Sequence, residues 1–116
     1  MAAKTTLACD EEVEKTGETS SKRVFDVTED NASDAAEKEA EDEARAAMSK
    51  AIGKIKNKYV CDDEDCPRMV VKRHLDTEIT CREASRRDPD TGAVENGYKC
   101  KAACTWTVTV ECEKSK

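Results

Sequence analysis

The chain has 116 residues, of which 40% are charged and 37% hydrophobic, and its formal net charge is -6. A chain of this length is expected to form one small domain. Because only 3% of its residues are aromatic, large apolar side chains alone are not expected to stabilise it. The acidic balance argues against a concentrated basic surface, and we therefore expect no nucleic-acid partner.

No stretch has the apolar length of a membrane-spanning helix or of a secretory signal peptide, so we expect no membrane span. The chain contains seven cysteines, which favour an extracytoplasmic or secreted location, although this sequence shows no signal peptide. The compartment decides whether the cysteines form disulfides or bind a metal ion.

Residues 1–21 are polar and acidic, with one leucine and one valine, and are predicted to be a disordered tail. Cys9 lies in this tail and is predicted to be a free thiol. Residues 22–28 resemble a short edge strand. Residues 22–116 are predicted to form a single small α+β domain, with a cysteine-rich part over residues 59–113.

From Asp34 to Tyr59 the chain is rich in Ala, Glu and Lys, which predicts one long acidic helix. Asp34 followed by Glu37 indicates its N-cap, and lysines are concentrated in its last turns, as the helix dipole favours. Apolar residues recur at helical spacing only in the second half. We therefore expect the C-terminal half of the helix to pack on the rest of the domain.

Residues 68–81 alternate between apolar and polar, and so do residues 100–112 (CKAACTWTVTVEC). The segment between them contains the turn signals DPDTG and Asn96-Gly97. The pattern predicts a long antiparallel β-hairpin with its loop centred on Pro89 to Thr91. Cys100, Cys104 and Cys112 all fall on its apolar face.

Disulfide stabilisation follows from this hairpin geometry, because the start of one strand lies beside the end of the other. The predicted pairs are Cys81–Cys100, Cys66–Cys112 and Cys61–Cys104. Six cysteines allow fifteen connectivities, and this one fits the predicted loop best.

A metal site is the alternative for the same cysteines. Cys61, Cys66, Cys100 and Cys104 supply four thiolates, although their spacings, C-x4-C and C-x3-C, differ from the C-x2-C pairs typical of zinc sites. His74 is predicted on the polar strand face, away from the cysteines. We expect no cofactor under the disulfide interpretation.

Other polar groups have ordinary structural explanations. The acids at 62–65 are consecutive, whereas calcium loops alternate their ligands. Arg82, Arg86 and Arg87 form a cluster that Glu83 and Asp88 are expected to neutralise. A row of threonines on the predicted polar face fits the strand propensity of threonine. It comprises Thr105, Thr107 and Thr109.

No catalytic arrangement of residues is recognisable, and we therefore expect a non-enzymatic, disulfide-stabilised interaction or structural module. Its partner is expected to be a protein, or a second copy that pairs with an exposed hairpin edge. Two alternatives remain open: an intracellular zinc-binding module, and a precursor whose acidic N-terminal half is a leader for a cysteine-rich product.

Overall fold

The computed structural model describes residues 3–114 and has an α+β fold, as predicted, with one helix and an antiparallel sheet. The helix, α1, spans Glu29–Lys58. The strands, in chain order, are β1 (Thr5–Thr6), β2 (Glu12–Ser20), β3 (Val24–Asp26), β4 (Tyr59–Val60), β5 (Arg68–Arg87) and β6 (Val94–Glu113).

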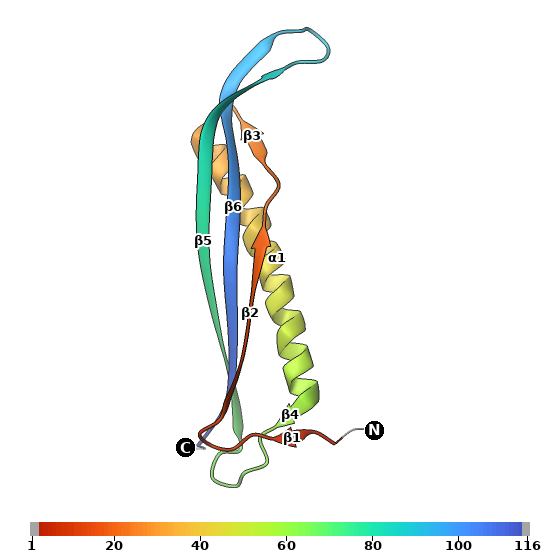
Figure 1. Cartoon of the computed structure of the whole chain (residues 1–116), viewed down its shortest axis with the longest axis vertical. Coiled ribbons are helices and arrows are strands. Elements are labelled where there is room, and N and C mark those ends of the chain that lie inside the picture. The colour runs from red at the N-terminus through yellow and green to blue at the C-terminus, as the bar shows by residue number, and fades with distance from the viewer. Residues whose placement is uncertain (1–2, 115–116) are drawn as a thin grey trace. The chain divides into compact units, whose positions relative to one another are not determined.

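Strand β6 is the centre of the sheet (Figure 1). It pairs with β5, its hairpin partner, and also with β2 and β3. The pairing of β3 with β6 is antiparallel and places Val24 opposite Cys100. A second, two-stranded sheet joins β1 to β4 in parallel, with Thr5 opposite Tyr59.

The prediction of a disordered tail over residues 1–21 is wrong for the part that the structure describes. Strand β2 has a mostly polar sequence, EVEKTGETS, and it forms because its backbone pairs with β6. Leu7 is buried, and its N–H donates a 2.9 Å hydrogen bond to the carbonyl of Val60. Backbone pairing of this kind leaves no trace in the side-chain pattern.

Residue contacts divide the chain into two compact units, a division that the prediction of one domain over residues 22–116 lacks. Unit 1 comprises the chain up to Gly17, Arg45–Leu75, and the chain from Trp106 onward. Unit 2 comprises Glu18–Ala44 and Asp76–Thr105. The boundaries fall inside the long elements, so α1, β2, β5 and β6 each contribute residues to both units.

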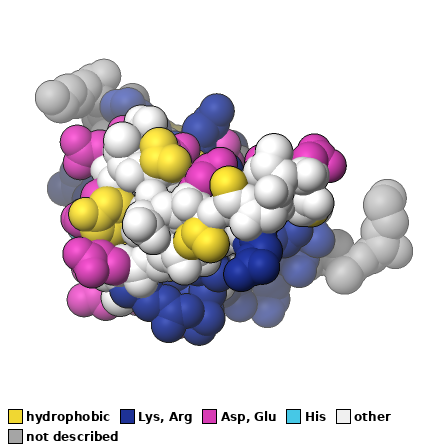
Figure 2. Space-filling view, turned by 90° about the horizontal axis from the view of Figure 1, so that it is seen from above, with side chains coloured by type: hydrophobic (Ala, Val, Ile, Leu, Met, Phe, Trp, Pro, Cys, Tyr) yellow, Lys and Arg dark blue, Asp and Glu magenta, His cyan; other side chains and the backbone are white. Residues whose placement is uncertain are grey.

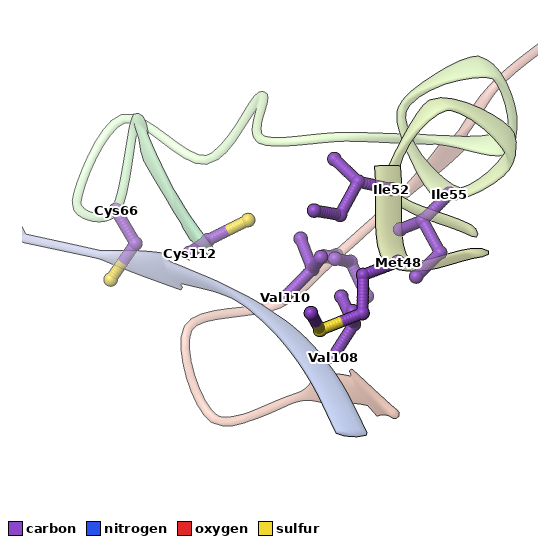
Figure 3. Close-up of a cluster of buried hydrophobic side chains, with 8 residues drawn as sticks. Met48, Ile52, Ile55, Cys66, Val108, Val110 and Cys112 are labelled. Carbon is purple, nitrogen blue, oxygen red and sulfur yellow. The ribbon is translucent and has the colours of Figure 1, made fainter. Parts of the chain in front are cut away.

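Unit 1 has a conventional apolar core. Met48, Ile52 and Ile55 of α1 point toward Val108 and Val110 of β6 (Figure 3). Their spacing along the helix places them on one face, as predicted for its C-terminal half. Burying each such side chain stabilises the fold by roughly 1.5–3 kcal/mol.

Unit 2 is built instead from small side chains. Ala32, Ala36, Ala40 and Ala44, four residues apart along α1, are all fully buried. The hydroxyl of Thr19 in β2 donates a 2.7 Å hydrogen bond to the carbonyl of Ala40, a contact that brings strand and helix backbone close together. The N-terminal half of the helix is therefore packed too, which its alanine-only pattern did not indicate.

The helix begins five residues before the predicted N-cap, Asp34. Thr28 is the cap: its hydroxyl accepts a 3.3 Å hydrogen bond from the N–H of Asn31, and its carbonyl accepts one from Ala32. Glu29 and Asp30 then occupy the first turn, where the helix dipole favours acids.

The hairpin loop lies where DPDTG predicts it. The N–H of Asp88 donates a 2.8 Å hydrogen bond to the carbonyl of Ala93, and Gly92 has a positive φ of 72°, which favours glycine. Asn96 and Gly97 lie within β6 instead of closing the turn.

Candidate functional site

Six of the seven cysteines form disulfides. Unit 1 contains Cys9–Cys66 and Cys61–Cys112, and unit 2 contains Cys81–Cys100. Among the described residues Cys104 is the free cysteine, and it is buried. The module is therefore stabilised by disulfides in each of its two units.

The Cys81–Cys100 bond follows from the hairpin register. Cys81 lies seven residues before Asp88 (88 minus 81), and Cys100 lies seven after Ala93 (100 minus 93), so both positions are equidistant from the closed loop. Their Cα atoms are 4.1 Å apart, as for residues directly opposite each other in an antiparallel pair. This pair is among those that the sequence predicts.

The other two predicted pairs, Cys66–Cys112 and Cys61–Cys104, differ from those in the structure. The pairing of β1 with β4 brings the N-terminal segment beside the end of α1, and Cys9 then bonds to Cys66. Cys61 bonds to Cys112 at the end of β6. Cys9 is therefore not the free thiol, and the error has the same origin as the missed strands.

Cys104 has no cysteine partner within unit 2, the other two cysteines of which are bonded to each other. Its sulfur lies 3.5 Å from the Thr77 hydroxyl, which donates a 2.9 Å hydrogen bond to Glu41 of α1. The thiol is thus buried in contact with the Thr77 hydroxyl.

The disulfides contradict the zinc site predicted as the alternative. Cys61, Cys66 and Cys100 have their sulfurs bonded to other cysteines, so of the four predicted ligands only Cys104 retains a thiol. Across residues 3–114, no three His, Cys, Asp or Glu side chains come together as a group able to hold a metal ion.

Turn chemistry accounts for the acidic loop after β4. The Asp63 carboxylate accepts a 2.9 Å hydrogen bond from the N–H of Asp65, and the Asp63 carbonyl accepts one from Cys66. Arg86 is likewise occupied: it pairs with Glu95 at 3.1 Å and lies over the ring of Phe25, 4.6 Å from its centroid.

Unit 2 contains an open hollow of about 480 Å³ on the sheet. Thr19 and Thr77 contact α1 through their side chains, and because strand side chains alternate, Glu18 and Glu78 point to the opposite face. The hollow therefore lies on the sheet face that α1 does not cover. Its charged lining residues are Arg23, Arg82, Lys99, Lys101, Glu18 and Glu78.

We call this feature the basic hollow, because four cations line it against two carboxylates. Lys99 and Lys101 come from the central strand β6, Arg82 from β5, and Arg23 from the connection between β2 and β3. Because side chains alternate between the two faces of the hairpin, Lys99, Lys101 and Arg82 lie on one polar face. Arg23 was missed because β2 and β3 were not expected to pair with β6.

The sheet of unit 1 carries an ion pair. Lys72 of β5 lies 2.7 Å from the carboxylate of Glu111 in β6. Its hydrogen bond and charge hold the pKa of Glu111 below the ordinary value, while Glu111 raises the pKa of Lys72. The Lys72 side chain is 63% exposed, so solvent screens this pair.

On the face shown in Figure 2, apolar side chains stand as separate patches among other side chains and backbone. Within residues 3–114, Val27 and Val94 are the exposed large apolar residues.

α1, the one helix among the described residues, has the length but not the apolar composition needed to cross a bilayer. Comparisons with protein-family models, with curated proteins and with solved structures found no match.

Proposed function

We propose that this disulfide-stabilised chain is a non-enzymatic interaction module that binds an acidic segment of a partner protein in the basic hollow. The observation that supports this proposal most strongly is the concentration of four cations in one hollow of an acidic chain.

The four cations are free to engage a partner. Within the described residues, no ion pair with an N–O distance of 4.0 Å or less involves Arg23, Arg82, Lys99 or Lys101. Glu18 and Glu78 line the same hollow without pairing with them at that distance. Unneutralised guanidinium and ammonium groups on a fixed sheet favour carboxylate or phosphate groups.

The charge of the basic hollow, and not the net charge of the chain, should determine whether an acidic segment binds. The chain as a whole carries -6 and repels an acidic partner at long range. At physiological ionic strength, however, charges are screened over about 8 Å, so a bound segment responds mainly to the hollow itself. The lining there sums to +2, from four cations and two anions.

The precursor alternative gains no support from the fold. The acidic half of the chain supplies β2, β3 and the first half of α1, and Cys9 is covalently bonded to Cys66. Removing that half as a leader would take two strands from the sheet, so we do not adopt it.

The test is charge reversal in the hollow. We expect Arg82→Glu/Lys99→Glu to weaken binding of a labelled oligoglutamate peptide at least about tenfold, measured by fluorescence anisotropy. The control, Lys38→Glu/Lys56→Glu, makes the same change in net charge at exposed helix positions outside the hollow. It is expected to change the affinity less than about twofold.

Three results would overturn the proposal: no binding of the peptide by the unmodified protein, equal losses in both variants, or a single-stranded oligonucleotide that binds the hollow more tightly than the peptide. The last would replace the protein partner with a nucleic acid. Affinity should also fall with added salt.

A further inference from the structure

We infer that unit 1 carries a second binding site, for a small amphipathic anion with an apolar body and one carboxylate. The site is a hollow of about 310 Å³, here called the indole hollow. It is lined by Trp106, Ala47, Ala51, Lys15, Lys50 and Lys54. This inference does not depend on the proposed function, which concerns unit 2.

Three elements build the indole hollow. Positions 47, 50, 51 and 54 follow the spacing i, i+3, i+4 and i+7, so they form one stripe of α1. β2 contributes Lys15, and β6 contributes Trp106. Because the two alanines of the stripe carry only methyl groups, space remains beside the indole that larger side chains would fill.

Gly17 fixes the indole in place. A Cβ atom at Gly17 would fall on atoms of the Trp106 ring, so the ring lies directly against the β2 backbone. The indole is nevertheless only partly buried, and the same side chain lines the hollow. Gly17 is therefore a positioning residue that holds one side of the ring and leaves ring surface available to a ligand.

The lining selects an anion. The hollow is mostly apolar, its three charged residues are all lysines, and no carboxylate lines it. None of these lysines forms an ion pair with an N–O distance of 4.0 Å or less among the described residues. Lysine stems lie along apolar surface while their ammonium groups stay at the rim, where they can meet a carboxylate.

The dimensions select a small ligand. Sites for small molecules typically span roughly 300–1,000 Å³, and this hollow is at the lower end. An aromatic ring stacks on an indole with an offset geometry that stabilises the contact by roughly 0.5–1.5 kcal/mol beyond area burial. A single-ring arylalkyl carboxylate meets both requirements.

Trp106 is the one tryptophan of the chain, so its emission reports directly on the hollow. We expect 3-phenylpropionate to cause a saturable change in that emission. The neutral analogue 3-phenylpropanol should bind at least about fivefold more weakly, because it has no charge for the lysines. The cationic 3-phenylpropylamine should cause no saturable change.

Two variants locate the site. Lys50→Gln/Lys54→Gln should weaken binding of 3-phenylpropionate about tenfold, whereas the control Lys38→Gln/Lys56→Gln, with the same net charge, should change it less than about twofold. Ala47→Leu fills the hollow and should abolish binding while the circular dichroism spectrum stays that of the unmodified protein.

The inference is overturned if the alcohol binds as tightly as the acid, if both lysine variants lose affinity equally, or if Ala47→Leu folds and still binds. It is also overturned if no ligand changes the emission. Reversing charge in the basic hollow, with Arg82→Glu/Lys99→Glu, should leave 3-phenylpropionate affinity unchanged. The two proposals can therefore fail separately.

Discussion

At the scale of single residues, Ser21 joins the connection between β2 and β3 to β6 through hydrogen bonds. Its N–H donates to the carbonyl of Ala102, and its hydroxyl accepts a 2.9 Å hydrogen bond from the N–H of the same residue. The hydroxyl also donates to the carbonyl of Lys22. The buried Ser21 side chain thus continues the hydrogen bonding to β6 in the connection between β2 and β3.

Ser21→Ala removes the acceptor for the buried Ala102 N–H. We expect a loss of about 1–3 kcal/mol in the free energy of unfolding, because a buried donor without a partner costs its full desolvation. Urea denaturation measures it. Ser49→Ala, at an exposed helix position, is the control and should cause no loss. Equal stability of the two variants would show that Ser21 has no such role.

The Lys72–Glu111 pair should make the stability of the folded state depend on pH. Because Lys72 lowers the pKa of Glu111, the pair stabilises the folded state above the ordinary glutamate pKa, and this contribution disappears as pH falls through the lowered pKa. Lys72→Met should raise the pKa of Glu111 toward the ordinary value, as measured by NMR titration of its carboxyl carbon. Lys56→Met should leave it unchanged. An unaltered pKa in Lys72→Met would contradict the pairing.

At the scale of elements, α1 uses two kinds of buried stripe. In unit 1 the stripe contains Met48, Ile52 and Ile55, whereas in unit 2 it contains only alanines. The hydrogen bond from Thr19 to the carbonyl of Ala40 fits the close approach that alanine permits. Side-chain size along one helix therefore matches two different environments.

Ala36→Leu tests the alanine stripe. Ala36 is fully buried, and a larger side chain there should cost about 1–3 kcal/mol through overpacking. The neighbouring variant Ala35→Leu lies at an exposed position and should change stability by less than about 0.5 kcal/mol. Thermal or urea denaturation of the pair measures the difference. A tolerated Ala36→Leu would mean that unit 2 has space beside the helix.

Some of the elements could be predicted from sequence patterns and others could not. Alternation over β5 and β6, together with the DPDTG turn, was sufficient to place the hairpin and the Cys81–Cys100 pair, because register follows from the loop. Strand β2 was missed since its pairing uses backbone groups that any sequence carries. For the same reason, the sequence did not predict that Arg23 lines the basic hollow or that Lys15 lies near Trp106 in the indole hollow. It also did not predict the partner of Cys9.

At the scale of the whole molecule, disulfides supplement the apolar packing of both units. Unit 1 has two disulfides and the larger apolar side chains, and unit 2 has one disulfide and the alanine stripe. In the chain-entropy model, a bond between residues 19 apart stabilises by about 3 kcal/mol and one between residues 57 apart by about 4 kcal/mol.

The stability lost when each bond is removed should follow the same order. Cys9→Ala/Cys66→Ala is expected to lower the free energy of unfolding by about 4 kcal/mol, and Cys81→Ala/Cys100→Ala by about 3 kcal/mol, in urea denaturation followed by circular dichroism. Cys104→Ala, which removes no bond, is the control. Losses no larger than that of Cys104→Ala would show that the apolar cores suffice without the bonds.

Peptide mapping by mass spectrometry under non-reducing conditions tests the disulfide connectivity. We predict linked peptides containing Cys9 with Cys66, Cys61 with Cys112, and Cys81 with Cys100. Cys104 should react with an alkylating reagent only after denaturation, because it is buried. A linked peptide containing Cys104, or alkylation of Cys9 in the native protein, would contradict this connectivity.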